Sequence, residues 1–166
     1  MKKMLLILVV CTVFSCKYNN QTTANKSVQL DTLQKQAAIV EVQDLIVNSF
    51  QEIWSNLDTT AIQKYHTKDF ILLENGAVWN NDTIANYMNK QRVKMAQQQF
   101  RRSNRFNFIK AVHNNGSIWI AYDNYGTFIK GTDTLRTIHW LESGVAIKEN
   151  NTWKLQQLHS TYVNRK

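Results

Sequence analysis

The chain of 166 residues carries 20 lysines and arginines against 12 acidic residues, so that its formal net charge is +8, and it has only two cysteines. This length suits a single domain. The two cysteines, Cys11 and Cys16, both lie near the start, which excludes a disulfide framework, a cysteine nucleophile and a cysteine-based metal site in the rest of the chain.

The N-terminal stretch MKKMLLILVVCTVFSCKYNN is typical of an export signal. Two lysines precede a run without charge from Met4 to Phe14, and this run is about half the roughly 20 residues that a membrane-spanning helix needs. Because Ser15 and Cys16 follow, the stretch resembles a bacterial lipoprotein signal, which implies removal of residues 1–15 and a lipid on Cys16. The alternative is an ordinary signal peptide cleaved elsewhere, since Phe14 is bulkier than the usual residue. We therefore predict an exported protein that faces the periplasm or the cell surface and is attached to the membrane by lipid.

Residues 16–31 are polar and without periodicity, which predicts a flexible tether, and residues 32–166 are expected to form the domain. From residue 32 to residue 56 apolar side chains recur every three or four positions, which indicates an amphipathic helix. They include Ile39, Val42, Ile46, Phe50, Ile53 and Leu57. Asp58 or Thr59 is expected to cap a short second helix that carries Ile62 and Tyr65 inward.

The segment DFILLENG, residues 69–76, predicts a strand that ends in a turn at Asn75 and Gly76, and the residues AVW predict a short return strand. Asn81 or Asp82 is expected to cap a third helix, whose apolar side carries Ile84, Tyr87, Met88 and Met95. Four strand-like stretches follow, separated by turn residues at 114–116, 130–133 and 150–151. They predict an antiparallel meander.

Helices first and long strands afterwards predict an α+β domain in which three N-terminal helices pack on one face of a strongly curved antiparallel sheet. Long twisted strands curl around what they cover. We therefore expect a cone with a pocket between the sheet and the helices.

This order of elements, with YHTKDFILLENG after the second helix and HWLESGVAIKENNTWKLQQLHST near the end, resembles the nuclear transport factor 2-like superfamily, in particular its SnoaL-like bacterial branch. The likeness extends over residues 33–163. It implies a conical fold with a pocket. It does not imply one reaction, because the relatives include isomerases, dehydratases, cyclases, hydrolases and binding modules without catalysis.

The strand HWLESGVAI, residues 139–147, places the carboxylate of Glu142 among apolar residues. Alternate residues of a strand face one side, so Glu142 shares a side with Trp140, Gly144 and Ala146, and we expect that side to face the interior of the cone. A buried carboxylate needs a partner. The first candidate is His159 on the last strand, because an imidazole can donate to a carboxylate. The other candidates are Tyr65, Asn104, Arg105, Tyr122 and Tyr125.

Two interpretations of Glu142 and His159 compete. In the first, the two residues belong to a buried polar network that only sets the register of the strands. In the second, they are a catalytic acid–base pair or a ligand-binding pair in a pocket. The pocket residues expected in that case are Trp54, Tyr65, Phe70, Trp79, Asn104, Arg105, Tyr122 and Trp140.

The sequence as a whole favours an exported protein that binds a small, anionic or partly apolar molecule. One alternative is a SnoaL-like isomerase, cyclase, dehydratase or hydrolase that uses Glu142 and His159. Another is a non-catalytic module that forms homodimers through an outer sheet face with Leu141, Val145 and Ile147.

No acidic residue lies between Thr83 and Tyr122. This indicates either a solvated basic face or a surface that attracts an anionic ligand or lipid headgroups. Because no motif for nucleic acid, metal or cofactor accompanies the charge, we predict none of these as a partner. His66 and His113 are expected to be exposed, and His139 is expected outside the pocket.

Overall fold

The computed structural model describes residues 20–163, and side chains from residue 31 onward. The elements in chain order are α1 (Asn20–Ser49), a π-helical turn η1 (Phe50–Ser55), a short 3-10 turn η2 (Thr59–Ala61), α2 (Ile62–Tyr65), β1 (His66–Glu74), β2 (Ala77–Trp79), α3 (Asn81–Gln98), β3 (Arg101–Asn114), β4 (Ser117–Lys130), β5 (Asp133–Glu149) and β6 (Thr152–Tyr162). The predicted export signal and Cys16 lie outside the described residues. Among the described helices, none has the length and apolar character needed to cross a membrane.

Helix α1 begins at Asn20 and not at Thr32, so the part of the expected tether that is described is helical. The chain divides into two compact units, one up to Leu33 and one from Gln34 onward. Residues 20–31 contain neither glycine nor proline, and extending a helix costs less than starting one. This explains why helical structure reaches beyond the apolar periodicity that predicted it.

The predicted first helix changes its geometry at Phe50. From Gln34 onward α1 buries Val42 and Ile46, and the chain then continues as the π-helical turn η1, in which the backbone N–H of Asn56 donates to the carbonyl of Gln51 over 2.9 Å. A π turn inserts an extra residue into a helix and is frequent at functional sites. Here it buries four of the six residues of η1, namely Phe50, Ile53, Trp54 and Ser55.

The short elements follow the prediction closely. Asp58 caps η2 by accepting from the backbone N–H of Thr60 over 2.9 Å, and Asn75 and Gly76 form the β1–β2 turn with positive φ angles. The cap of α3 differs, because Asn80 and neither Asn81 nor Asp82 accepts from the backbone N–H of Thr83 over 2.8 Å. Asn81 instead donates to the carbonyl of Thr67, so its side chain ties α3 to β1.

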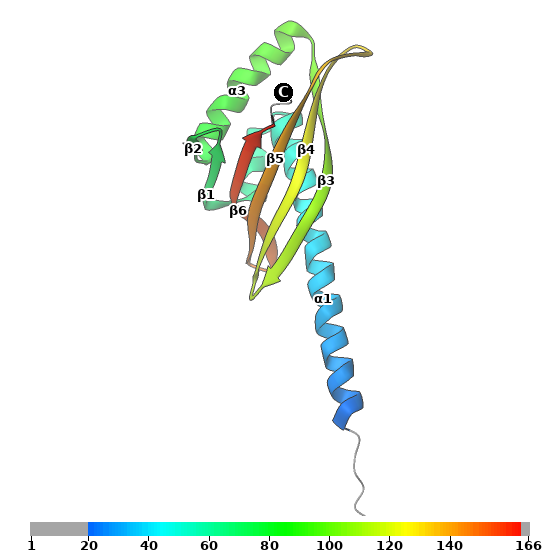
Figure 1. The fold of residues 1–166 in the computed structure, drawn as a ribbon. Coiled ribbons are helices and arrows are strands. Elements are labelled where there is room, and N and C mark those ends of the chain that lie inside the picture. Colours follow the sequence, from blue (N-terminus) through cyan, green and yellow to red (C-terminus); the bar gives the residue numbers. More distant parts are fainter. Residues whose placement is uncertain (1–19, 164–166) are drawn as a thin grey trace, which may run out of the picture. The chain divides into compact units, whose positions relative to one another are not determined.

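One sheet contains all six strands in the order β2-β1-β6-β5-β4-β3 (Figure 1). The predicted meander of β3, β4, β5 and β6 is antiparallel, but β1 joins β6 in parallel. An unpaired strand edge exposes a row of backbone N–H and C=O groups. Pairing with β1 covers that edge of β6.

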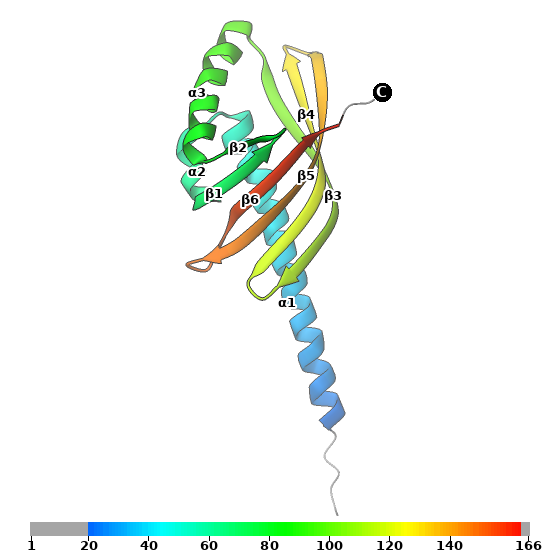
Figure 2. The ribbon, with the colours of Figure 1, turned by 60° about the vertical axis from the view of Figure 1, so that its left-hand side comes forward.

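The core lies on the concave face of the curved sheet. Strand residues on this face pack with Phe50 and Ile53 of η1, Ile62 of α2, and Ile84 and Met88 of α3; the strand residues include Phe70, Leu72, Ile118, Ile120, Tyr122, Leu155 and Leu158. Figures 1 and 2 show α3 running alongside the β1–β2 hairpin. The predicted α+β cone is therefore confirmed for the unit that begins at Gln34.

The convex face of the sheet combines exposed apolar side chains with a polar cluster. Trp119 and Leu141 are 40% and 48% exposed. Beside them His139 contacts Asp123 over 2.8 Å and stacks on Tyr125, and Arg105 lies over the Tyr125 ring. Homodimer formation through this face stays a prediction.

Candidate functional site

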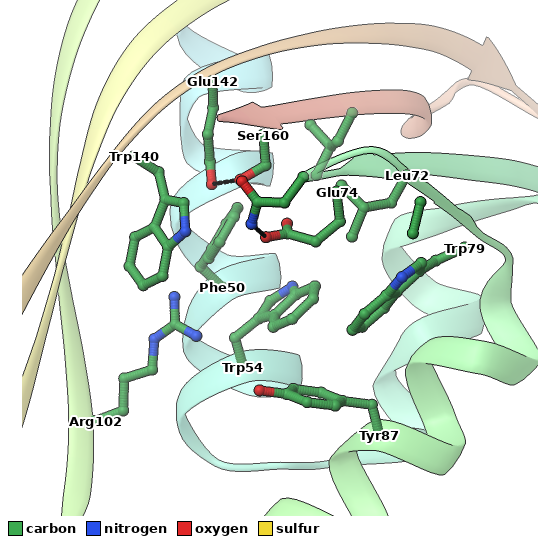
Figure 3. A pocket seen from close by; sticks show the side chains of 13 residues that line it. Phe50, Trp54, Leu72, Glu74, Trp79, Tyr87, Arg102, Trp140, Glu142 and Ser160 are labelled. Atoms are coloured by element: carbon green, nitrogen blue, oxygen red, sulfur yellow. Dashed lines mark hydrogen bonds between the residues drawn. The ribbon is translucent and has the colours of Figure 1, made fainter. Parts of the chain in front are cut away.

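A cavity of about 330 Å³ opens inside the cone, between the sheet, the π-helical turn, α3 and the β1–β2 hairpin. Figure 3 shows the side chains that line it. They are Phe50, Trp54, Leu72, Glu74, Asn75, Ala77, Trp79, Tyr87, Arg102, Trp140, Glu142, Leu158 and Ser160. Three tryptophans, one arginine and two glutamates therefore surround one space.

Glu142 lies on the inner face of β5, opposite Tyr122 on β4 and Ser160 on β6. It is only 6% exposed. Its Oε1 atom accepts from Asn124 Nδ2 and from Ser160 Oγ, each over 3.2 Å. Its Oε2 atom and the hydroxyl of Tyr122 are buried without a hydrogen-bond partner of good geometry among the described residues.

The surroundings of Glu142 bring the pKa of its carboxyl group close to neutral pH. Burial raises the pKa of Glu142 to about 7, because a buried carboxylate loses its hydration, while Asn124, Tyr122, Arg102 and Ser160 act in the opposite direction. Near neutral pH the side chain is therefore a mixture of acid and carboxylate. Such a group can donate or accept a hydrogen bond, and it can exchange a proton with a ligand.

Two asparagines connect Glu142 to the arginine of the site. Asn104 Nδ2 donates to Asn124 Oδ1 over 2.6 Å, and Arg102 Nε donates to Asn104 Oδ1 over 3.0 Å. The row Arg102–Asn104–Asn124–Glu142 thus crosses β3, β4 and β5. Because each amide has its donor and acceptor engaged, the row fixes how the Glu142 carboxyl group is oriented.

Arg102 extends toward the tryptophans of the wall, as Figure 3 shows. Its guanidinium carbon lies 5.1 Å from the ring centroid of Trp140 and 5.8 Å from that of Trp54. Burial lowers the pKa of Arg102 to about 10, so the group stays charged at neutral pH. Within residues 31–163 it makes no ion pair within 4 Å. The charges of Glu142, Tyr87 and Glu74 oppose the effect of burial on its pKa, and the aromatic faces beside it attract the cation as well.

The rest of the wall is aromatic. Trp54 stacks on Phe50 with ring centroids 5.8 Å apart, and Tyr87 lies 5.1 Å from Trp79 and 6.4 Å from Trp54. Gly126 makes room for Trp140, because a Cβ atom at this position would meet Trp140 Cζ3 at 2.8 Å. These contacts fix rings from η1, β2, α3 and β5 around the cavity.

Four of the predicted site residues line this cavity, namely Trp54, Trp79, Trp140 and Glu142. Asn104 belongs to the polar row behind the wall, and Tyr122 lies fully buried beside Glu142. Three others lie elsewhere. The Tyr65 hydroxyl donates to Glu52, Phe70 stacks on His66, and Arg105 lies over Tyr125 on the convex face.

The predicted pair of Glu142 and His159 is wrong. His159 is exposed and lies opposite Ser143, whereas Ser160 lies opposite Glu142. The cause is a register shift in the β5–β6 pair, in which Val145 pairs with Gln157 and Ala146 with Leu155. This bulge reverses the alternation that follows Trp153 and Leu155, so that Leu158 and Ser160 face inward.

Sequence reasoning missed Arg102, Glu74, Tyr87, Asn124 and Ser160. A usable signal existed for Arg102, because Arg102, Asn104, Phe106 and Phe108 alternate with more exposed residues along β3. If the side of β3 that carries the two phenylalanines had been taken as the inward side, Arg102 would have been placed in the cavity and Arg105 outside it. No comparable signal marks Glu74, which depends on the parallel pairing of β1 with β6, or Ser160, whose inward direction depends on the bulge between β5 and β6. The described residues contain no group of three or more His, Cys, Asp or Glu side chains suited to a metal ion.

The sequence matches no known family model and no curated protein. The structure is similar to ActVI-ORFA from Streptomyces coelicolor, with a TM-score of 0.66, 15% identity, and 79% of this chain and 98% of that chain covered. For Aln2 from a Streptomyces species the TM-score is 0.65, with 10% identity and 76% and 91% covered. For a nuclear transport factor 2-like protein from Cytophaga hutchinsonii it is 0.55, with 10% identity and 78% and 98% covered. The chain therefore has the nuclear transport factor 2-like cone fold, and likeness at these identities is a statement about the fold alone.

Proposed function

We propose that the protein binds a small, partly apolar molecule in the cavity of the cone. The observation that carries this proposal is the wall itself, in which Trp54, Trp79 and Trp140 surround a space together with the buried, adjustable carboxyl group of Glu142. Cavities of this kind, mostly aromatic with a few convergent polar groups, are typical ligand sites. The rings provide contact area, and the polar groups orient the ligand.

The experiment is a thermal-shift and calorimetric screen of neutral aromatic amides and alcohols, cinnamamide among them, against the wild type and Gly126→Ala. The added methyl group would meet Trp140 Cζ3 at 2.8 Å and Arg102 Nε at 3.3 Å, so the ring of Trp140 must shift and the cavity wall changes shape. We expect affinity for the ligands found to fall at least about tenfold, with a stability loss of about 1–3 kcal/mol from overpacking.

The matched control is Gly116→Ala in the β3–β4 turn. Gly116 has φ +87° and no atom near its would-be Cβ, so this change costs about 1–2 kcal/mol of stability through backbone strain without touching the cavity. Ligand affinity should be unchanged. The proposal would be contradicted if the screen found no ligand, or if Gly126→Ala and Gly116→Ala reduced ligand affinity equally.

Proton transfer on the bound molecule is a second candidate function. The observation that favours it is the Oε2 atom of Glu142, which makes no hydrogen bond of good geometry among the described residues although the Tyr122 hydroxyl lies beside it. Glu142 also has a pKa of about 7, which suits a general acid or base. In this case Glu142→Gln abolishes turnover and keeps binding. If the protein only binds its ligand, the wild type has no turnover, so Glu142→Gln cannot abolish any.

Export and lipid attachment are proposed from the N-terminal sequence. We expect Cys16→Ala to abolish incorporation of labelled palmitate and to move the protein from the membrane fraction to the soluble fraction. Cys11→Ala, which removes the other cysteine, should leave both unchanged. Membrane association that persists in the Cys16→Ala protein would instead favour a retained N-terminal segment.

A further inference from the structure

A second hollow, of about 360 Å³, adjoins the cavity between the C-terminal half of α3 and the ends of β3, β4 and β5. It shares three wall residues with the cavity, namely Tyr87, Arg102 and Trp140. Lys94 and Arg136 also line it, and its described wall contains no carboxylate. The two hollows therefore differ in charge. The cavity is lined by Glu74 and Glu142 as well as Arg102, whereas the charged side chains that line the adjoining hollow are all basic.

Arg102 belongs to both walls and has unused hydrogen-bonding capacity. Its hydrogen bond within residues 31–163 comes from Nε, which leaves the two terminal nitrogens of the guanidinium without a protein acceptor. The planar group lies against Trp140 and Trp54 and faces Phe128 at 5.9 Å. A guanidinium that is held among aromatic rings and has free terminal nitrogens is suited to donate two parallel hydrogen bonds to a carboxylate.

Arg136 strengthens the positive field beside Arg102. Its guanidinium carbon lies 4.6 Å from the ring centroid of Phe128, so the two arginines share one phenylalanine. Lys94 approaches the same hollow from α3. Like charges placed together cost free energy when nothing neutralises them, and a bound anion would remove that cost.

We infer that the ligand of the cavity is an organic anion, with its apolar body against the tryptophans and its acid group held by Arg102 at the junction with the basic hollow. This inference rests on the proposed function. The two glutamates determine the orientation, because Glu142 and Glu74 lie on the β5 and β1 side of the cavity and repel an acid group placed among them. The acid end therefore points toward Lys94 and Arg136.

The test uses three molecules of nearly equal shape, namely cinnamate, cinnamamide and cinnamylammonium, titrated into the full chain by calorimetry at neutral pH. Cinnamate should bind at least about tenfold more tightly than cinnamamide, which corresponds to one charge-assisted contact. Cinnamylammonium should bind most weakly. Arg102→Gln should remove the advantage of cinnamate over cinnamamide.

Arg105→Gln is the matched control, because Arg105 lies three residues away on the same strand but contacts Tyr125 on the convex face. It should leave the advantage intact. Arg136→Gln supplies a second variant that keeps Arg102, and it should weaken cinnamate by a few-fold with little effect on cinnamamide.

The outcomes separate the inference from the function on which it rests. Equal binding of cinnamate and cinnamamide, or tighter binding of cinnamylammonium, overturns the inference and leaves the binding function standing. An advantage of cinnamate over cinnamamide that survives Arg102→Gln also overturns it. If the cinnamyl compounds and the whole neutral panel fail to bind, both the inference and the proposed function fall.

Discussion

At about pH 8 the Glu142→Gln variant should be more stable than the wild type by about 3 kcal/mol, the free energy of a pKa raised from 4.5 to about 7. The glutamine keeps the shape and mimics the protonated acid. Its carbonyl oxygen can still accept from Asn124 and Ser160, and its amide can reach the unpartnered side of the carboxyl group near Tyr122. The substitution therefore removes a buried negative charge without leaving a new unpaired atom.

The sign of the pH dependence follows from the direction of the shift. The folded state holds the Glu142 proton more tightly than the unfolded state, so the wild type loses stability as the pH rises from about 4.5 through about 7 and no further above that. The glutamine does not titrate. The difference between the two proteins should thus be near zero at about pH 4 and reach its full size at about pH 8.

Urea unfolding at the two pH values measures the difference. The control is Glu149→Gln, which removes a carboxylate from the exposed end of the same strand, where Glu149 lies 3.7 Å from Lys154; its effect should stay below about 1 kcal/mol. A loss of about 3–5 kcal/mol for Glu142→Gln at pH 8 would contradict this account, because it would mean that Glu142 is ionised and paired with Arg102.

Phe50→Ala should destabilise the protein by about 3–5 kcal/mol, the usual cost of removing a buried aromatic ring. Phe50 begins the π-helical turn and is 3% exposed. Its ring contacts Trp54 and meets the edge of Phe106 at 5.3 Å. Removing the ring leaves a void between the turn and β3 and releases Trp54 from one side.

The matched control for Phe50 is Val47→Ala, one turn earlier on α1. Val47 is 39% exposed, so its loss should cost less than about 1 kcal/mol. Urea unfolding monitored by circular dichroism gives the free energies, and tryptophan fluorescence reports the environment of the indoles. Equal effects of the two changes would show that the π-helical turn does not anchor the helical layer on the sheet.

Much of the fold was predictable because its signals are local. The periodicity of the first helix, the cap at Asp58, the turn at Asn75 and Gly76, and the four long strands each depend on residues close together in sequence. The π geometry at Phe50 and the cap at Asn80 were not predictable in the same way. Trp54 widened the apolar stripe, but only contacts with Phe50 and Tyr87 show which wall it joins.

The candidate site was only half predictable. Alternation along β5 requires only neighbouring residues, so the side chains that share a side with Glu142 could be predicted, and the structure buries Glu142 as expected. The partner of Glu142 could not be assigned, because a single extra residue in β6 exchanged His159 for Ser160. The alternation along β3 has the same effect: Arg102 faces the cavity, whereas Arg105, three residues later, faces the other side of the sheet.

The sequence by itself determined the α+β class, the set of residues that share a side of the strand with Glu142 and the basic stretch without acids, since each depends on composition or on short-range periodicity. The tertiary structure alone decided the parallel pairing of β1 with β6, the bulge that turns His159 outward, and the meeting of Arg102 with Trp54 and Trp140. The physical reason is that strand register and packing between distant elements are set by many contacts at once. A shift of one residue in the register of a strand moves every side chain that follows it to the opposite face of the sheet.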